Sequence, residues 1–304
     1  MGNNAIAVNG AIVNGATAQV ALTTHGSDFY FAVCAVMTVA TIAFISLAFM
    51  RPRKDRVFHY ITSGVTMVAA IAYFTMGSHL GWTPITVEFQ RSNPIVRGTT
   101  REIYYARYID WVITTPLLLL DLMLTAAMPL PSILWIILVD EVMIITGLIG
   151  ALVASDYKWG YYVFGCVALF PILYVLVWEA RKHANNISRE AGQAFLYCGS
   201  LTALLWTFYP IAWGLSEGGN VISSDGEAVF YGVLDMLAKP GFGALLLWGH
   251  RHIPAESLGL NIHDYGENEP MVREKKGKHT NGTDNGVVNH DGVTGTNDTA
   301  AQTV

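Results

Sequence analysis

The sequence predicts an all-α membrane protein, a bundle of seven transmembrane helices. Of its 304 residues, 52% are hydrophobic and only 13% are charged, whereas a soluble domain carries about 25% charged residues. The apolar residues fall into seven stretches, and about 20 helical residues cross a hydrocarbon core about 30 Å thick. Because lipid offers the backbone no hydrogen-bond partners, each stretch must be a helix. The expected spans are 29–50, 58–80, 103–126, 133–154, 160–178, 194–215 and 228–248.

The chain outside the spans predicts the domain organisation and the orientation. We expect an extracellular N-terminal segment at 1–26, a transmembrane domain at 27–254 and a cytoplasmic, largely disordered tail at 255–304, whose polar composition buries little apolar surface. Loops 51–56 and 181–189 and the segment after the last span are rich in Lys and Arg, which favours their placement in the cytoplasm. Arg91, Arg97 and Arg101 in the second loop run against this rule.

Lys239 lies near the centre of the last span, with Asp235 one helical turn before it. An isolated lysine at mid-membrane costs about 2.5–3.5 kcal/mol, so such residues are usually retained for function. The two residues share a helix face. A lysine amine can condense with an aldehyde to form a Schiff base, and the protonated form of that bond needs a counter-ion. The pair therefore predicts a buried cationic group held by a carboxylate.

The third span carries two carboxyl groups in different surroundings. Asp110 and Asp121 are eleven residues apart, roughly 16 Å along one helix face. Arg107, Thr114 and Thr115 lie near Asp110, whereas Asp121 follows four leucines. Opposite charge favours an ionised carboxyl group and apolar burial a protonated one, so we expect an ionised Asp110 and a protonated Asp121. Such a pair suits proton acceptor and donor roles; the structural alternatives are an Asp110–Arg107 ion pair and an interfacial position for Asp121.

Four further acids lie in or beside the spans. Asp140 is expected to make a polar contact with a neighbouring helix, and the pattern assigns no role to Glu141. Glu217 and Glu227 flank the loop before the last span, where they are either solvated loop acids or part of a buried pathway.

The sixth span carries an aromatic stripe formed by Trp206, Tyr209, Pro210 and Trp213, which share one helix face. Such a stripe packs a core or, if the lysine carries a flat polyene, forms the wall of its site, to which Trp111 of the third span could add. Pro210 is expected to kink or loosen the helix.

Three motifs together resemble the microbial (type 1) rhodopsins, in particular the fungal branch related to bacteriorhodopsin. They are Arg107-Tyr-Ile-Asp110-Trp-Val-Ile-Thr-Thr-Pro-Leu-Leu-Leu-Leu-Asp121, Trp206…Tyr209-Pro210…Trp213 and Leu234-Asp235-Met-Leu-Ala-Lys239-Pro-Gly-Phe-Gly243. The resemblance covers about residues 27–250. It implies a seven-helix retinal-binding domain in which all-trans retinal is bound covalently to Lys239 as a protonated Schiff base.

The resemblance also implies roles in proton transfer. Asp110 and Asp235 would be the counter-ions, and Asp110 would accept the Schiff-base proton. Asp121, helped by Thr62, would return a proton from the cytoplasmic side. The proton-release path would use Arg107, Glu217 and Glu227.

Further residues are placed around the retinal by the same resemblance. Tyr73 and Tyr209 would donate hydrogen bonds to Asp235, and Thr115 would pair with Asp140. Tyr161 would stand where the family usually has a tryptophan. The full set beside retinal would be Tyr73, Trp111, Thr115, Leu118, Asp140, Met143, Gly147, Tyr161, Trp206, Tyr209, Pro210 and Trp213.

The function implied is a light-driven outward proton pump, a transporter and not an enzyme, because vectorial transfer needs carboxyl groups at both the acceptor and the donor positions. A photosensory or slow-cycling regulatory rhodopsin is the alternative; a retinal-free, chaperone-like relative is disfavoured by Lys239. The expected partners are protons and the lipid bilayer, with no nucleic acid and no metal. A homo-oligomer, either trimer or dimer, is compatible with the sequence, and the expected location is the plasma membrane, as a multi-pass protein.

Overall fold

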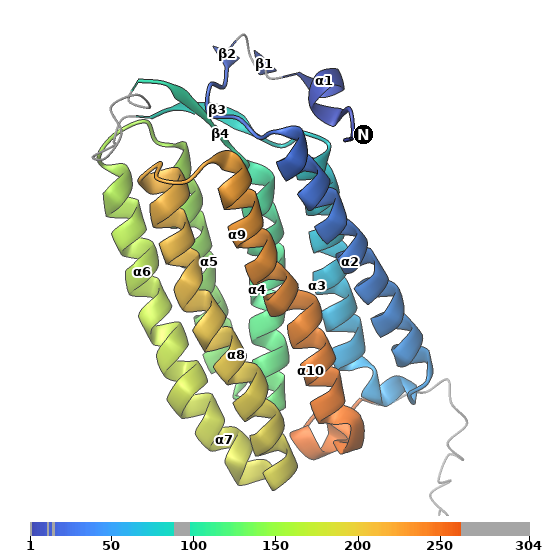
Figure 1. Ribbon diagram of the computed structural model, residues 1–304. Helices are drawn as coiled ribbons and strands as arrows, with labels where there is room; N and C mark the ends of the chain where they lie inside the picture. The colour runs from blue at the N-terminus through green and yellow to red at the C-terminus, as the bar shows by residue number, and fades with distance from the viewer. Residues whose placement is uncertain (1, 11, 14–15, 88–97, 263–304) are drawn as a thin grey trace, which may run out of the picture. The chain divides into compact units, whose positions relative to one another are not determined.

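The computed structural model describes residues 2–10, 12–13, 16–87 and 98–262, and in this part of the chain seven helices of membrane-spanning length run side by side as one bundle (Figure 1). The predicted seven-helix architecture is therefore confirmed. Arg91, Arg97 and the predicted tail from residue 263 onward lie outside the described residues. The seven spans are Thr24–Phe49, Val57–Gly77, Tyr105–Thr125, Leu130–Leu152, Lys158–Ile187, Arg189–Gly218 and Ser224–His252.

Successive helices of the bundle pack against one another, and the last returns to the first. Helix α2 (Thr24–Phe49) packs on α3 (Val57–Gly77), α3 on α4 (Tyr105–Thr125), α4 on α5 (Leu130–Leu152) and α5 on α6 (Lys158–Tyr174). Helix α8 (Arg189–Trp213) packs on α9 (Ser224–Met236), and α9 also contacts α2. This closure gives the bundle an interior shared by all its helices.

Three spans begin four or five residues before their predicted starts. The Thr23, Ser188 and Ser223 side chains cap α2, α8 and α9 by accepting hydrogen bonds from the backbone N–H groups of the first helical turn. Capping satisfies donors that a helix start leaves free. Hydropathy misses these polar first turns, which is why the predicted starts at 29, 194 and 228 are too late.

The predicted third span also starts in the wrong place, because residue 103 belongs to a strand. β4 (Thr100–Ile103) pairs antiparallel with β3 (Thr83–Thr86), and α4 begins only at Tyr105. Val20 forms a bridge to Arg101, so the chain before α2 lies against this hairpin. The hairpin covers one end of the bundle, called the Arg101 end here (Figure 1). The opposite end, the Arg251 end, carries η1 (Arg53–Asp55), η5 (His250–His252) and η6 (Ala255–Leu258).

Three spans contain a π-helical turn, a feature that often marks functional sites. The turns are η2 (Val175–Glu179), followed by α7 (Ala180–Ile187), η3 (Gly214–Gly218) at the end of α8, and η4 (Leu237–Gly241) between α9 and α10 (Phe242–Gly249). Turn η4 contains Lys239 and Pro240, and proline has no N–H to continue the α-helical ladder. Before α2 lie α1 (Ala5–Asn9) and the short strands β1 (Ile12–Val13) and β2 (Ala16–Thr17).

Polar and apolar side chains are distributed in the way a bilayer requires. Large apolar residues such as Ile42, Phe74 and Phe170 are exposed on the outside of the bundle, while ionisable residues are buried within it. A charged group in lipid is costly, so buried ionisable residues face the bundle interior. Three groups of interior ionisable side chains along α4 form the candidate site.

Candidate functional site

Lys239 lies between two carboxylates from two helices. Its Nζ contacts Oδ2 of Asp110 on α4 and lies 3.0 Å from Oδ2 of Asp235 on α9. Asp235 also accepts hydrogen bonds from the hydroxyl groups of Tyr73, at 2.8 Å, and Tyr209, at 2.6 Å. Oδ1 of Asp110 has no hydrogen-bond partner among the described residues. Asp235 is thus held by three donors, whereas Asp110 keeps a free acceptor atom beside the amine.

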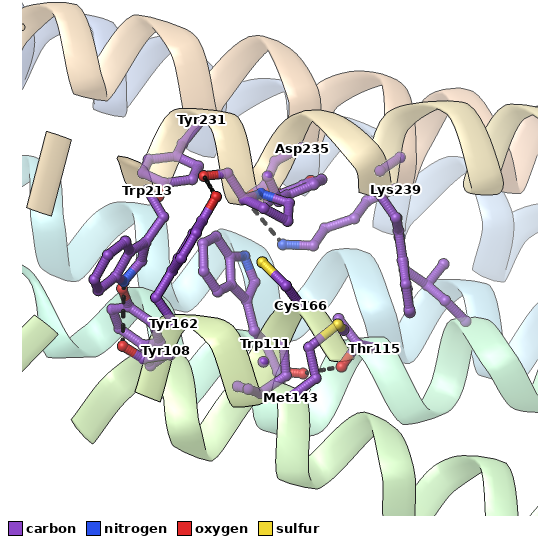
Figure 2. Close-up of a pocket in the computed structure, with 18 residues that line it drawn as sticks. Tyr108, Trp111, Thr115, Met143, Tyr162, Cys166, Trp213, Tyr231, Asp235 and Lys239 are labelled. Carbon is purple, nitrogen blue, oxygen red and sulfur yellow. Dashed lines mark hydrogen bonds and ion pairs between the residues drawn. The ribbon is translucent and has the colours of Figure 1, made fainter. Parts of the chain in front are cut away.

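A cavity lined mainly by aromatic and other apolar side chains adjoins Lys239, and ligand pockets are typically lined in this way. Figure 2 shows the lysine extending toward Asp235, with Trp111 nearby and Trp213 and Tyr162 farther along the site. Predicted residues that line it are Trp111, Thr115, Leu118, Met143, Gly147, Trp206, Tyr209, Pro210, Trp213, Asp235 and Lys239. Residues that the sequence did not predict are Tyr108, Ile144, Tyr162, Gly165, Cys166, Tyr231 and Ala238.

Tyr162, rather than the predicted Tyr161, forms part of the cavity wall. Its ring stacks on Trp213, with centroids 5.0 Å apart and planes 22° apart, and its hydroxyl donates to the Pro210 carbonyl at 3.2 Å. Consecutive residues on a helix point about 100° apart, and Tyr161 instead lies against Gly150. The prediction chose the wrong one of two adjacent tyrosines.

Tyr73 and Asp140 act behind the cavity wall rather than in it. Tyr73 holds Asp235, as described above. The Thr115 hydroxyl donates to Asp140 at 2.7 Å and links α4 to α5. The expected Thr115–Asp140 pair is therefore present in the structure, and it fixes the side chain of a lining residue.

Asp121 is fully buried, and neither of its carboxyl oxygens has a hydrogen-bond partner among the described residues. Its backbone carbonyl accepts from the Thr125 hydroxyl at 2.7 Å. Thr62 does not contact the Asp121 carboxyl group as expected, because its hydroxyl donates to the backbone carbonyls of Phe58 and His59. Asp121 is thus a buried acid that no ion pair stabilises.

Arg107 points away from Asp110 and toward the Arg101 end. Its Nη1 lies 3.1 Å from Glu217 and 2.6 Å from Glu227, and its Nη2 donates to the Tyr30 hydroxyl at 2.9 Å. Its guanidinium carbon lies 4.2 Å from the Tyr231 ring centre. The structural alternative of an Asp110–Arg107 ion pair is therefore wrong, because Arg107 is engaged with the two glutamates.

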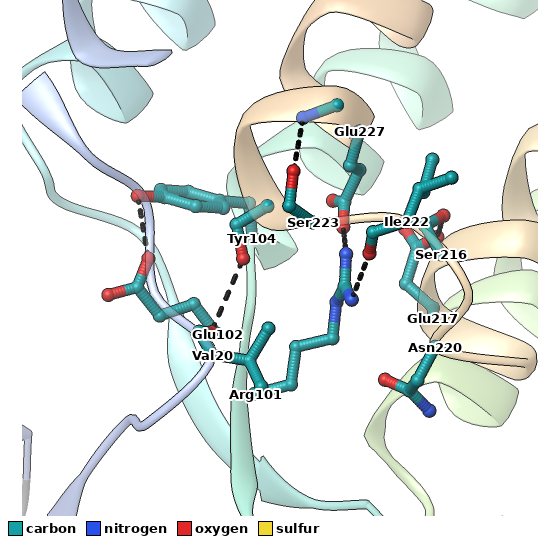
Figure 3. A network of polar contacts seen from close by, with 12 residues as sticks. Val20, Arg101, Glu102, Tyr104, Ser216, Glu217, Asn220, Ile222, Ser223 and Glu227 are labelled. Carbon is teal, nitrogen blue, oxygen red and sulfur yellow. Dashed lines mark hydrogen bonds and ion pairs between the residues drawn. The ribbon is translucent and has the colours of Figure 1, made fainter. Parts of the chain in front are cut away.

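Arg101 adds a second guanidinium to Glu227 (Figure 3). Its Nη2 lies 2.6 Å from Glu227 Oε2, and its Nη1 donates to the Ile222 carbonyl at 2.8 Å. Glu217 and Glu227 are each only 1% exposed, so the interpretation of solvated loop acids is wrong. Sequence reasoning did not assign Arg101 to the site, although its conflict with the positive-inside rule was a usable signal. Burial with Glu227 explains that exception.

Comparisons with known proteins show the family to which this chain belongs. The family model described as bacteriorhodopsin-like protein matches residues 25–253. Opsin-like protein carO of Fusarium fujikuroi is 64% identical over 265 residues, which cover 87% of this chain and 86% of that protein. The chain belongs to the bacteriorhodopsin-like family, and its relatives place it among the fungal microbial rhodopsins.

Two solved structures resemble the fold at a TM-score of 0.71. One is rhodopsin CsR of Coccomyxa subellipsoidea, described as a light-driven proton pump, with 39% identity and coverage of 75% of this chain and 98% of that one. The other is LR (Mac) of Leptosphaeria maculans, described in the same way, with 38% identity and coverage of 77% and 97%. The family implies a retinal chromophore. The aromatic cavity beside a buried lysine fits a flat, apolar aldehyde.

Proposed function

We propose that this protein is a light-driven outward proton pump in which Lys239 binds all-trans retinal as a protonated Schiff base. The observation that carries the proposal is the order of groups along α4. Asp110 contacts the lysine nitrogen through Oδ2 and keeps Oδ1 free, and eleven residues further on lies Asp121, which is buried and has no hydrogen-bond partner for its carboxyl group among the described residues. The solved relatives described as light-driven proton pumps support it.

The cavity residues would hold the chromophore. Bound retinal would supply light absorption and a light-dependent change at the proton on the Lys239 nitrogen. Trp111, Trp206 and Trp213 would flank it with flat apolar surfaces and exclude water. Leu118, Met143 and Gly147 complete the wall, and Thr115 is held in place by Asp140.

Asp110 would accept the proton from the Lys239 nitrogen. It is in direct contact with that atom, and its free Oδ1 can bind a proton without breaking another hydrogen bond. Asp235 suits the other role, that of a fixed counter-ion, because the Tyr73 and Tyr209 hydroxyl groups stabilise its charged form. The two carboxylates thus divide acceptor and counter-ion roles.

Asp121 would return a proton to the same nitrogen. A buried carboxylate without a partner costs several kcal/mol, so the group holds a proton at rest. Loss of that proton is transient and is reversed from the Arg251 end of the bundle. Arg107, Glu217 and Glu227 lie on the opposite side of Asp110 and would carry protons out.

The distribution of basic residues supports the outward direction. Arg51, Arg56 and Arg251 lie at the Arg251 end, and basic residues near span ends favour the cytoplasmic side. We infer that this end faces the cytoplasm, so that residues 1–26 lie outside and the chain from residue 255 onward lies inside. The membrane is taken to be the plasma membrane.

The test is a light-driven pH change in cells or oriented vesicles that contain the protein and retinal. Illumination should acidify the exterior, and a protonophore should abolish the signal. Lys239→Ala should give no pigment, whereas Lys182→Ala, at an exposed lysine, should keep both colour and pumping. A coloured Lys239→Ala protein contradicts the attachment site. A photocycle of seconds without a pH change would favour the photosensory alternative.

A further inference from the structure

A second group of buried titratable side chains lies at the Arg101 end, outside the seven spans, and has no part in the function proposed above. It consists of Glu102 on β4, His79 after α3, and Tyr104. Their side chains are almost completely buried. His79 has a φ of +59°, in the left-handed region that residues other than glycine seldom adopt. Strain of this kind tends to persist at functional positions.

The three side chains form a closed ring of polar atoms. Glu102 Oε1 and His79 Nε2 lie 3.4 Å apart as an ion pair, and neither atom makes a hydrogen bond among the described residues. Tyr104 lies between their other polar atoms, 3.3 Å from Glu102 Oε2 and 3.1 Å from His79 Nδ1. The Leu22 N–H also donates to Glu102 Oε2, at 2.8 Å.

This ring can hold either two or three protons on its side chains. With two, the Tyr104 hydroxyl donates to His79 Nδ1, and His79 Nε2–H donates to a Glu102 carboxylate. With three, Tyr104 donates to Glu102 Oε2, His79 Nδ1–H donates to Tyr104, and protonated Glu102 Oε1 donates to His79 Nε2, so His79 is in its other neutral tautomer and Glu102 is the neutral acid. The hydroxyl reverses its direction, because it carries only one proton. The ring thus takes up or gives off one proton, and in the two-proton state Glu102 Oε2 keeps its hydrogen bond from the Leu22 N–H.

The surrounding charges place this ring beside the proposed exit path. Arg101, next to Glu102 in the strand, pairs with Glu227, while Glu102 lies on the other side with Tyr104 (Figure 3). The Tyr104 ring packs edge-on against Tyr30, with centroids 5.7 Å apart, and Tyr30 accepts a hydrogen bond from Arg107. The charged and titratable groups around Glu102 are His79, Tyr104, Arg101, Glu227, Tyr30 and Arg107. Leu80, next to His79, is 46% exposed, so the ring also lies close to the surface.

We propose that the Glu102–His79–Tyr104 ring is a further proton-binding site, which takes up the proton leaving the Glu217–Glu227 network and passes it to the surface. This inference rests on the proposed outward pump. The proton moves from the network to the ring and then to water. On loading, His79 Nδ1 takes up the arriving proton, His79 Nε2 passes its own proton to Glu102 Oε1 and the Tyr104 hydroxyl turns; unloading reverses these changes. Burial of Glu102 raises its pKa from the ordinary 4.5 to about 7, which supports loading and unloading near neutral pH.

The expected dwell time follows from proton-binding rates. A group with a pKa of about 7 that binds protons at a diffusion-limited rate of about 10⁹–10¹⁰ M⁻¹s⁻¹ holds each one for about 1–10 ms. At pH 8 the ring is empty before the flash and delays the proton by that time. At pH 6 the ring is already filled, and this delay is absent.

The experiment follows flash-induced proton release with a pH dye, in retinal-loaded protein at pH 6 and pH 8. The wild-type protein should show the millisecond delay only at pH 8, and Glu102→Gln should show no such delay at either pH while pumping continues. Asp225→Asn removes a carboxyl group at the same end, one that accepts hydrogen bonds only from Thr23 within the described part of the chain, and it should behave like wild type. Equal release times for Glu102→Gln and wild type at pH 8 would overturn the proposal.

An infrared titration in the dark tests the ring without any pumping. The protonated carboxyl band of Glu102, assigned by its loss in Glu102→Gln, should disappear with a midpoint near pH 7. Tyr104→Phe keeps the aromatic contact with Tyr30 and removes the hydroxyl whose hydrogen-bond partner differs between the two proton states, so it should move the midpoint. It also provides a readout if Glu102→Gln does not fold. No titrating band near neutral pH, or an unmoved midpoint in Tyr104→Phe, contradicts the ring. Wild-type protein without a light-driven pH change contradicts the pump but leaves this titration valid.

Discussion

Asp110 and Asp121 lie on the same helix, yet they differ in the charged and hydrogen-bonding groups around their carboxyl groups. Asp110 contacts the nitrogen of Lys239, and Arg107, three residues earlier on the same helix, belongs to a network of two arginines and two glutamates. Asp121 is equally buried, and its carboxyl group has no hydrogen-bond partner among the described residues. Breaking a buried ion pair leaves an uncompensated charge, whereas removing an unpaired polar group leaves nothing uncompensated. The same helix therefore offers one carboxyl site built for charge and one built for a neutral acid.

The largest effect is expected at the charged site. Asp110→Asn keeps the size of the side chain but removes the base in contact with the Lys239 nitrogen. Initial rates of light-driven acidification should fall to background, measured in vesicles with an external pH electrode. Asp110→Glu keeps a carboxyl group and should retain measurable transport. Pumping by Asp110→Asn at the wild-type rate would remove Asp110 from the acceptor role.

Substitution of Asp121, the neutral acid, should impair function while leaving the unfolding free energy almost unchanged. Asp121→Asn should slow the return of the proton to the Lys239 nitrogen by about 100-fold, a typical loss for a missing general acid, as followed by flash spectroscopy at neutral pH. Its unfolding free energy should change by less than about 1 kcal/mol, because no partner is lost. Asp121→Glu should restore much of the rate. A large loss of stability would show that Asp121 has a structural partner.

Glu227→Gln tests the charged network at the Arg101 end. It leaves the buried guanidinium groups of Arg101 and Arg107 with less negative charge, so we expect a loss of about 3–5 kcal/mol in unfolding free energy. Denaturant unfolding of the pigment in detergent measures it. Asp225→Asn, two residues earlier in the same helix and less buried, should cost less than about 1 kcal/mol. Similar values for both variants would contradict the contrast between paired and isolated carboxyl groups.

Glu102 predicts a pH dependence of stability. Its pKa is about 7 in the folded protein against an ordinary 4.5, so folding holds the proton more tightly. The resulting stabilisation is complete below about pH 4.5 and is lost as the pH rises through about 7, by at most about 3 kcal/mol. Unfolding free energies at pH 5 and pH 8 should differ less in Glu102→Gln than in wild type. An identical pH dependence in the two proteins would rule out a raised Glu102 pKa.

The smallest effect is expected behind the cavity. Thr115→Val removes the hydrogen bond to Asp140 and should cost on the order of 1 kcal/mol, together with a shift of the absorption maximum. Thr146→Val is the control, because the Thr146 hydroxyl bonds only backbone carbonyls within its own helix. Thermal unfolding and an absorption spectrum measure both. A larger loss in Thr146→Val would show that the interhelical link does not matter.

The sequence predicted the spans and the lysine–carboxylate centre because both depend on local patterns. Apolar length gives a span, and an i, i+4 spacing places Asp235 beside Lys239. The same patterns could not predict Glu102 and His79, which come from different segments that meet only across the covered end of the bundle. Nor could they choose between Tyr161 and Tyr162, because the rotation of a helix depends on its neighbours.

The amino-acid sequence by itself determined that the chain crosses a membrane seven times and carries ionisable residues within the spans. Both can be predicted from sequence because the free energy of moving a side chain from water into the membrane depends mainly on the type of that residue. Only the tertiary structure decided the partners. Arg107 faces two glutamates and not Asp110, Arg101 is buried against Glu227, and the Asp121 carboxyl group has no hydrogen-bond partner in the part of the chain that the structure describes. The physical reason is that an ion pair needs its charged side-chain atoms to lie about 3 Å apart, and for residues on different helices only the folded bundle sets that distance.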